Sequence, residues 1–499
     1  MVSRHEASVS RTGLFACGYQ NNFLIGLSTR LTWPVGNDII TMRAAAREGR
    51  RWAAPRLVDQ GGAARVQERS SGDGPAGMRL DNQRFLIYSQ DGLGLGHLRR
   101  TTSIANEILR VLPRACVLTL SDSPLGGFFD SRPNHDFLKL PSIVKTGPGD
   151  WHALALAMDF GDVSALRREL ILSTAKHFQP HVLLVDHMPH GAMGELVPAL
   201  DELSKRGRTK VVLGLRDILD SPQVIRERWR IEGAYDAIRR YYDMVLVYGS
   251  RELFDHADQY DLPSDIAAKL RYCGYVCAPR RARYTRSIRA EYKKRSDTPT
   301  KLIVGMAGGG ADGYTTLRSL LDAVPLLEAS ISRYRLVMIT GPFMPEEQRQ
   351  ELQARAVGLP VRVRRTVADP FSYICAADAV VAMAGYNSTM EILRSGTPCV
   401  MVPRMGPSSE QKIRVGLFRS QGWVDKVDPS KISGRELADA ICRALDRGKD
   451  KDARTGPDLD GLPRAVNHLR SLLPPSTPDP KLTSSAALDA DATSAQEHH

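Results

Sequence analysis

Residues 380–403 read VVAMAGYNSTMEILRSGTPCVMVP, and this stretch decides the fold. An apolar run is followed by Gly385, a short helical pattern, a Gly-Thr-Pro turn and a second apolar run. Apolar runs of this length are typical of buried strands in a parallel sheet. Gly385 suits the positive φ or close approach of a strand-to-helix turn, and Asn387 or Ser388 can cap the helix that follows. The stretch therefore predicts one strand–helix–strand step of an open α/β sheet.

Glu391 is the acidic residue of this step. It falls early in the expected helix, near the carboxyl edge of the sheet, where open α/β folds bind ligands. An acid near a helix start also interacts favourably with the helix dipole without binding anything. The pattern alone leaves both interpretations open.

The same stretch resembles the donor-nucleotide motif of family 28 glycosyltransferases. These are GT-B enzymes that include the lipid II-forming N-acetylglucosaminyltransferase and the plant galactolipid synthases. Two turns, a helical acid and a Gln-containing loop define the motif, and the matching residues here are Ala384, Gly385, Ser388, Glu391, Gly396, Pro398, Pro403 and Gln411. The hydroxyl position of the motif is shared between Ser388 and Thr389.

Length and composition set the class of protein. A chain of 499 residues is too long for one core and suggests two domains with extensions. The net charge of +12 suits an anionic partner, such as a nucleotide sugar or an anionic lipid surface, without choosing among them. Seven scattered Cys favour reduced thiols in a cytosolic protein, and the Cys273–Cys277 pair lacks the second pair that a zinc site needs. No apolar run reaches the roughly 18 residues of a membrane span.

The chain divides into five parts by composition and periodicity. We expect a disordered N-terminal extension (1–80), an N-terminal Rossmann-like acceptor domain (81–278), a basic linker (279–300), a C-terminal Rossmann-like donor domain (301–473) and a disordered tail (474–499). The extension has ten Arg and no Lys before Met78 and no sustained period. An Arg-rich presequence is conceivable, and translation that begins at Met42 or Met78 explains this composition equally well.

Alternating strands and helices in both larger parts predict parallel sheets with crossover helices. Between the first strands of the acceptor domain, residues 139–159 read as a loop followed by a helical pattern. Lys145, Trp151 and His152 make this segment a candidate acceptor-side lid, although exposed loops carry such residues without function. The late segment GLPRAVNHLRSLL, residues 461–473, is expected to form a final helix that packs back across the cleft.

His97 ends the Gly-rich turn DGLGLGH and opens the first helix of the acceptor domain. An imidazole near a helix N-terminus is held in its neutral form, which suits a base, although a lone His is more often structural. The resemblance implies that His97 faces the cleft as base or acceptor-positioning residue, with Gly94 and Gly96 in the acceptor-side loop. Asp122 and Asp186 end strands at the same edge, and either could orient the imidazole or act as the base.

The donor site is expected in the C-terminal part. In GMAGGGADGY (305–314), three successive Gly allow backbone N–H groups to approach a diphosphate at a helix N-terminus. Asp312 departs from the family motif, which usually has a hydroxyl residue and little acid in this turn. A carboxylate here would repel a diphosphate, unless Asp312 caps the helix or points to a sugar hydroxyl. A Gly turn without a ligand remains the alternative. The resemblance implies donor contacts by Gly308, Gly309, Gly310, Val367, Gly385, Asn387, Ser388, Glu391, Glu410 and Gln411. Arg404 or Lys412 could form an ion pair with a phosphate of the donor. The alternative for residues 404–412 is a solvated loop without a ligand.

These observations together predict a GT-B fold of two Rossmann-like domains and an inverting, metal-independent glycosyltransferase. It would move a hexose or N-acetylhexosamine from a UDP-sugar to a hydroxyl of a glycan, lipid or small molecule. No cofactor is expected, because the sugar nucleotide is a substrate. No metal ligand is expected, because the Gly turn and the helix dipole would stabilise the negative charge of the leaving diphosphate. Cytoplasmic location with peripheral contact at an anionic inner membrane surface is expected, without nucleic acid.

Two alternatives remain open from the sequence. One is a GT-B sugar-nucleotide 2-epimerase or hydrolase, which shares the fold and donor site. The other is a nucleotide-sugar-binding protein without catalysis. Specificity for the sugar and for the acceptor depends on loops, and the sequence of these loops does not identify either one.

Overall fold

The computed structural model describes residues 31–35, 38–42, 82–90, 96–124, 131–147, 150–279, 282–292, 300–448 and 456–474. The chain divides into two units, Met1–Gly77 and Met78–His499. In the first unit, β1 (Leu31–Val35) pairs with β2 (Asp38–Met42) in antiparallel fashion, which the composition does not indicate. The remainder of the expected extension, the loop residue Gly94 and the tail from 475 lie outside the described residues.

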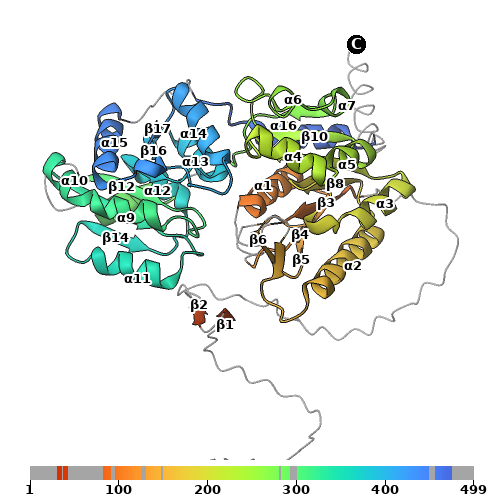
Figure 1. Cartoon of the computed structure of the whole chain (residues 1–499), viewed down its shortest axis with the longest axis horizontal. Helices are drawn as coiled ribbons and strands as arrows, with labels where there is room; N and C mark the ends of the chain where they lie inside the picture. The colour runs from red at the N-terminus through yellow and green to blue at the C-terminus, as the bar shows by residue number, and fades with distance from the viewer. Residues whose placement is uncertain are drawn as a thin grey trace, which may run out of the picture. The chain divides into compact units, whose positions relative to one another are not determined.

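The second unit opens with a seven-stranded sheet in the order β11-β10-β9-β8-β3-β4-β5, and every neighbouring pair is parallel. Its strands are β3 (Arg84–Ser89), β4 (Cys116–Ser121), β5 (His135–Lys139), β8 (Val182–Asp186), β9 (Lys210–Arg216), β10 (Met244–Tyr248) and β11 (Leu270–Tyr272). Its helices are α1 (Gly96–Val111), α2 (Phe160–Phe178), α3 (Val197–Arg206), α4 (Pro222–Ile231), α5 (Ala234–Tyr241), α6 (His256–Gln259) and α7 (Ser264–Ala267), with the 3₁₀ turn η1 (Ala192–Gly194). The expected parallel sheet of the first half is confirmed (Figure 1).

The segment expected as a loop followed by a helix contains an antiparallel hairpin instead. β6 (Ile143–Gly147) pairs with β7 (Asp150–Ala153), and α2 starts only after Asp159, whose carboxylate accepts from the N–H of Gly161 at 2.7 Å. Trp151 is buried in a small apolar cluster with Ile143, Val163 and Ala192. This side chain therefore anchors the hairpin to the body of the domain, and the helical pattern expected within residues 139–159 is wrong.

A second parallel sheet follows, in the order β14-β13-β12-β15-β16-β17. Its strands are β12 (Lys301–Met306), β13 (Tyr334–Ile339), β14 (Val361–Arg364), β15 (Ala379–Ala382), β16 (Cys399–Met401) and β17 (Asp425–Lys426). Its helices are α9 (Tyr314–Asp322), α10 (Val324–Ser330), α11 (Glu346–Arg355), α12 (Pro370–Ala376), α13 (Tyr386–Ser395), α14 (Glu410–Ser420) and α15 (Gly434–Arg447), with the 3₁₀ turn η2 (Pro429–Lys431). The stretch 380–403 is the predicted step, because α13 connects the adjacent parallel strands β15 and β16.

Residues 279–300, expected as a linker, contain α8 (Thr285–Tyr292), which packs against α12 of the second half. Arg289 forms a bidentate ion pair with Asp378, with N–O distances of 2.7 and 2.9 Å. The N–H of Tyr284 donates to the Ser372 hydroxyl at 3.1 Å. The charged composition of this segment thus reflects a partly exposed helix and not a free connection.

The last helix, α16 (Gly461–Ser471), packs against α1, as expected for a helix that crosses back to the first half. Its N-terminus lies so close to the backbone of Gly274 that a β-carbon on Gly461 would come within 2.4 Å of the Gly274 carbonyl oxygen. The N–H of Gly461 donates to the carbonyl of Tyr275 at 3.0 Å. Residues 461–471 therefore lie on the first half, although the predicted boundaries place them in the second.

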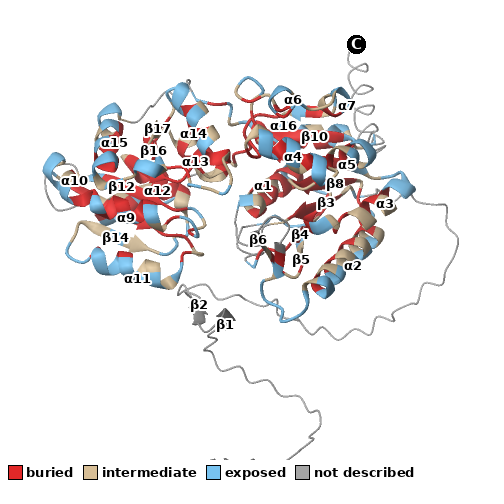
Figure 2. Ribbon diagram, viewed as in Figure 1, coloured by how far each residue is buried: buried red, intermediate tan, exposed pale blue. Residues whose placement is uncertain are grey.

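Buried side chains continue from one half into the other (Figure 2). The ring of Tyr275 from the first half lies 6.1 Å from Tyr386 and 5.7 Å from Phe418 of the second half, centroid to centroid. A buried ion pair joins Arg414 to Asp217 across the same boundary, with N–O distances of 2.6 and 2.7 Å. Among the helices of the described ranges, none has the length and apolar character of a membrane span.

Candidate active site

His97 lies in the first turn of α1 and contacts the end of β8. Its Nδ1 is 2.6 Å from Oδ2 of Asp186, and the carboxylate is fully buried. Arg100, one helical turn further on, donates to both oxygens of Asp186 at 2.7–3.3 Å. Of the two carboxylates considered from the sequence, Asp186 is the one that orients His97.

The neighbours of His97 determine which nitrogen of a neutral ring carries the proton. Burial opposes ionisation of Asp186, but Arg100 and then His97 outweigh it and hold the pKa of Asp186 well below its usual range. Nδ1 of His97 faces both the ionised carboxylate at 2.6 Å, which only accepts, and Nη2 of Arg100 at 3.0 Å, which only donates. The carboxylate is the shorter contact, and Arg100 already donates to both of its oxygens, so we assign the proton of a neutral ring to Nδ1. The lone pair of His97 is therefore on Nε2, which is the arrangement of a general base oriented by an acid.

Asp122 belongs to a different network. Its Oδ2 accepts from Gln90 at 3.3 Å and lies 3.5 Å from Nη1 of the buried Arg167. Arg167 also pairs with Glu195, which accepts from the hydroxyl of Tyr88 at 2.7 Å. Asp122 is thus part of a buried structural ion-pair network beneath the carboxyl end of the first sheet.

His187 was not singled out from the sequence, although it directly follows Asp186. Its backbone has φ 83°, and its ring lies 5.3 Å from that of His97 at an angle of 33°. Burial, with the charge of Arg216 next, holds the pKa of His187 well below its usual value. A histidine directly after a strand-ending Asp was the available signal, but its backbone conformation cannot be read from residue types.

The predicted diphosphate turn has the backbone that its glycines require. Gly308 and Gly310 have φ of 62° and 101°, and a β-carbon on Gly310 would lie 2.4 Å from the carbonyl oxygen of Thr340. Helix α9 follows directly, and its N-cap residue Gly313 provides no side-chain cap. Asp312 therefore does not cap the helix. Its carboxylate instead lies 3.6 Å from Nη1 of Arg404.

The start of α13 differs from the prediction in two respects. Gly385 is the N-cap with φ −64°, and a β-carbon there would meet nothing within 4 Å, so the fold itself does not require a glycine. Neither Asn387 nor Ser388 caps the helix, because both lie within its first turn. Thr389 donates its hydroxyl to the Gly385 carbonyl at 2.8 Å. Ser388, which makes no side-chain hydrogen bond in the described part of the chain, is thus the hydroxyl left for a ligand.

Helices α1 and α13 bring the two predicted sites together. Asn387 donates to the carbonyl of Gly96 at 2.9 Å, and Arg99 forms an ion pair with Glu391 in the second turn of α13. A cavity of about 10 Å³ is lined by residues that include Arg99, Asn387 and Glu391. A cavity of this size holds about one water at most. A nucleotide can contact Glu391 here only if Arg99 moves.

The loop before α14 contacts the first half through its acidic residue. Glu410 is buried and forms ion pairs with Arg216 at the end of β9 and with Arg404, the latter at 3.2 Å. Burial opposes its ionisation, but Arg216, Arg414 and Arg404 outweigh it and lower the pKa of Glu410. The side chain of Gln411 accepts from the N–H of Arg404 at 3.1 Å. The two ends of the loop, Arg404 and the α14 residues Glu410 and Gln411, are therefore held together, while Met405 between them is exposed.

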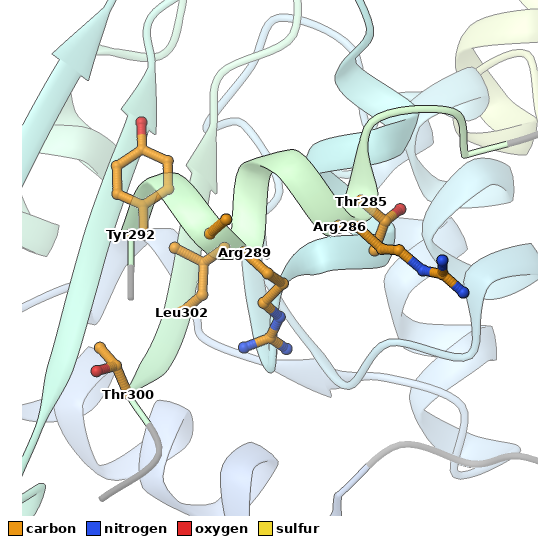
Figure 3. Close-up of a pocket in the computed structure, with 7 residues that line it drawn as sticks. Thr285, Arg286, Arg289, Tyr292, Thr300 and Leu302 are labelled. Carbon is orange, nitrogen blue, oxygen red and sulfur yellow. The ribbon is translucent and has the colours of Figure 1, made fainter. Parts of the chain in front are cut away.

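The remaining predicted donor residue, Val367, is half-buried against the core shared by the two halves. A larger cavity, of about 450 Å³, lies away from all these residues, between α8 and β12 (Figure 3). Its lining includes Arg289, Tyr292 and Leu302 and contains no acid or histidine. Residues 293–299, which join α8 to β12, lie outside the described ranges. The candidate chemistry is at the α1–α13 contact instead.

Within the described ranges, no three His, Cys, Asp or Glu side chains lie together as a metal site would require. The sequence has an Asp-x-Asp spacing at Asp450 and Asp452, at Asp458 and Asp460, and at Asp489 and Asp491. The second of these lies in the described ranges, and its carboxylates pair with Arg464 and Arg394. The six cysteines of these ranges are unpaired with one another.

Comparison with known proteins agrees with this division of the chain. Residues 306–457 match the glycosyltransferase family 28 C-terminal domain. An uncharacterised glycosyltransferase of Methanosarcina mazei is 28% identical over 189 residues, which are 36% of this chain and 47% of that protein. The UDP-N-acetylglucosamine–N-acetylmuramyl-(pentapeptide) pyrophosphoryl-undecaprenol N-acetylglucosamine transferase of Bacillus subtilis is 26% identical over 186 residues, 37% of this chain and 50% of the enzyme. The chain thus spans about half the length of the curated relatives it matches.

Solved structures of the same fold cover more of the chain. The glycotransferase of kitacinnamycin aligns with 79% of this chain and 100% of its own, with a TM-score of 0.52 and 16% identity. A proposed UDP-N-acetylglucosamine 2-epimerase of Listeria monocytogenes aligns with 78% of this chain and 95% of its own, with a TM-score of 0.50 and 12% identity. The fold is thus shared by a transferase and a proposed epimerase and does not separate them. The chain has the GT-B fold, and residues 306–457 of its second half match the glycosyltransferase family 28 C-terminal domain.

Proposed function

We propose that this protein is an inverting, metal-independent glycosyltransferase that moves a hexose or N-acetylhexosamine from a UDP-sugar to an acceptor hydroxyl. The observation that carries the proposal is the contact between α1 and α13. It brings a histidine with the hydrogen bonding of a general base beside the helix that carries the donor motif. The two helices are far apart in the sequence: the hydrogen bond between Asn387 and Gly96 joins residues that are 291 positions apart.

The donor would be held by backbone and side chains of the second half. The turn at Gly308 and Gly310 and the N-terminus of α9 would receive the diphosphate, since backbone N–H groups and the helix dipole favour negative charge there. Glu391 would accept hydrogen bonds from the ribose hydroxyls once Arg99 has moved. Arg404, beside the turn through Asp312, supplies a positive charge for the leaving group. Preorganised dipoles and this cation would take the place of a metal ion.

The first half would supply the base. The acceptor oxygen attacks the anomeric carbon while Nε2 of His97 takes the hydroxyl proton, and the bond from that carbon to the diphosphate oxygen breaks on the opposite face. Configuration at the anomeric carbon is then inverted. Asp186 holds the imidazole in the required tautomer and stabilises the imidazolium that forms.

The acceptor would be reached over the hairpin side of the first half. Leu154, Leu156 and Met158 follow β7 directly, and all three are exposed. Exposed apolar side chains grouped in one segment are typical of contact with lipid or with a partner. The Bacillus subtilis relative acts, by its name, on an undecaprenol-linked acceptor. We therefore extend the proposal to a lipid-linked acceptor at an anionic, cytoplasmic membrane surface, where the net charge of +12 is favourable.

The competing function is a sugar-nucleotide 2-epimerase or hydrolase. A transferase releases UDP only when an acceptor is present and forms a glycosylated product. An epimerase converts the sugar nucleotide without an acceptor, and a hydrolase releases free sugar. Incubation of the full chain with a panel of UDP-sugars, with and without a broad acceptor panel, separates these outcomes by product mass. Acceptor-independent conversion as the sole activity would replace the transferase proposal.

A further inference from the structure

His187 has an unfavourable backbone conformation at the carboxyl end of β8. A φ of 83° is uncommon for any residue with a β-carbon, although histidine tolerates it better than most, and such residues gather at functional sites. The N–H of His187 donates to the carbonyl of Gly214 at 2.9 Å, so the neighbouring strand β9 fixes this conformation. The chain thus holds the ring in place at a cost to its stability.

Among the described residues, no hydrogen bond of the ring explains this position. Nδ1 of His187 is buried and makes no hydrogen bond within the described part of the chain. Buried polar atoms without a partner are rare in folded proteins, and each one requires a reason. Since Nδ1 is covered, Nε2 is the nitrogen through which the ring can reach a substrate.

The surroundings of the ring select its tautomer. Burial and the positive charge of Arg216 keep the imidazole uncharged, as the lowered pKa of His187 indicates. A neutral imidazole has one N–H and one lone pair. An N–H at the buried Nδ1 would have no acceptor and would be repelled by the positive charge of Arg216. A lone pair on Nδ1 is favoured beside this charge. The proton is therefore on Nε2, which makes this nitrogen of His187 a hydrogen-bond donor.

We propose that His187 binds and orients the acceptor hydroxyl for His97. Nε2–H of His187 donates to the acceptor oxygen, and Nε2 of His97 accepts the proton of the same hydroxyl. The two ring centroids are 5.3 Å apart, which allows one oxygen atom to contact a nitrogen of each ring. His187 keeps its proton throughout, and the donated bond stabilises the negative charge that develops on the attacking oxygen. This assignment rests on the proposed transferase function.

Three variants test the assignment. His187→Gly removes the ring and adopts the positive φ without strain, whereas His187→Asn keeps a side-chain donor in a residue type that tolerates this conformation. Gln179→Gly is the matched control, because Gln179 also has a positive φ, of 48°, but caps α2 on the protein surface. For each, the melting temperature, the Kd for UDP and the acceptor kinetics are measured on the full chain.

The acceptor kcat/KM of His187→Gly should fall by about 10–100-fold, the loss expected for one hydrogen bond to a partly charged oxygen. The Kd for UDP should stay within about two-fold, because the nucleotide site lies in the other half. The melting temperature should rise by about 1–2 °C, as in Gln179→Gly, because strain is released. His187→Asn should recover part of the acceptor kinetics.

The melting temperature separates a loss of folded protein from a loss of acceptor binding. A fall in acceptor kcat/KM of His187→Gly that is fully accounted for by a smaller folded fraction would overturn the assignment. Wild-type acceptor kinetics in His187→Gly would also overturn it. If His97→Ala and Glu391→Gln lose activity while His187→Gly does not, only this assignment fails. If neither of those two variants changes turnover, the proposed function itself fails.

Discussion

At the scale of single residues, the contact between His97 and Asp186 bears most directly on catalysis. His97→Ala should lower the rate of the chemical step by about 10²–10⁴-fold, which is the usual contribution of a positioned general base. The Kd for UDP should stay near that of the wild type, because the proposed nucleotide site lies in the other half. Single-turnover kinetics on an acceptor found by the panel measures the effect.

A matched control for this variant is His177→Ala, which changes an exposed histidine on α2 and should leave turnover unchanged. Wild-type turnover in His97→Ala would exclude the imidazole as base. Loss of activity in proportion to a loss of folded protein would instead show that His97 stabilises the start of α1.

Residue types in the sequence could identify His97, Asp186 and Glu391, because each stands at a strand end or helix start where α/β folds bind ligands. They could not identify the charged side chains that contact these three. Arg99, which pairs with Glu391, and Arg100, which contacts Asp186, read as ordinary helix positions. Which carboxylate each arginine contacts depends on how two elements pack, and spacing along the chain does not encode that packing.

At the scale of elements, the contact of α1 with α13 determines access to the donor site. Arg99 and Glu391 form an ion pair whose side chains are 17% and 7% exposed. Donor binding through Glu391 must displace Arg99, so Arg99→Met should lower the Kd for UDP by about five-fold, corresponding to an ion pair of about 1 kcal/mol. Calorimetric titration measures the change. Weaker binding in Arg99→Met would show that Arg99 itself holds the nucleotide.

The edge strand β5 gives stability a dependence on pH. Burial lowers the pKa of His135 to about 4, and its Nε2 lies 2.9 Å from the hydroxyl of Thr119. The folded state keeps this ring neutral, while the unfolded chain takes up a proton below its pKa of about 6.5. Stability is therefore lost as the pH falls from about 6.5 to 4, by up to about 3 kcal/mol from this group.

His135→Gln removes the titration and keeps a polar partner for Thr119. Its melting temperature should fall less steeply than that of the wild type between about pH 6.5 and 4. Other buried histidines, including His187 and His256, have lowered pKa values and will leave part of the slope in place. Parallel slopes in the two proteins would show that His135 does not titrate with folding.

The central strands could be predicted because they are continuous apolar runs between turn residues. β5, with the sequence HDFLK, could not, since a half-exposed edge strand carries polar residues and has no clear pattern. The β6–β7 hairpin was missed for a related reason: its two strands are short and its main anchor is one buried tryptophan. Edge elements depend on tertiary contacts more than on local pattern.

At the scale of the whole second unit, the two halves are joined by a buried ion pair. The side chains of Arg414 and Asp217 are 0% and 2% exposed. Arg414→Met would leave Asp217 buried without its partner and should lower stability by about 3–5 kcal/mol. The double variant Arg414→Met/Asp217→Asn should lose less than the sum of the single variants. Denaturant titration measures these values, and additive losses would show that the pair is not coupled.

The division into two parallel α/β halves was predictable from periodicity and two Gly-rich turns. It was only partly predictable that the last helix, α16, packs on the first half. Its apolar face indicates that it packs against a core, and the resemblance suggested that it returns across the cleft. The close approach at Gly461 that fixes it is visible only in three dimensions. Composition likewise did not reveal that α8 of the expected linker belongs to the second half.

The central claim is that a UDP-sugar binds through Glu391 in the second half. Titration calorimetry of UDP against the wild type, Glu391→Gln and the exposed control Glu328→Gln tests it most directly. We expect the Kd of Glu391→Gln to rise by about 10–100-fold, since a carboxylate bonded to ribose hydroxyls contributes about 1.5–3 kcal/mol, with the control unchanged. Equal affinity for UDP in Glu391→Gln and the wild type, with both folded, would contradict the claim.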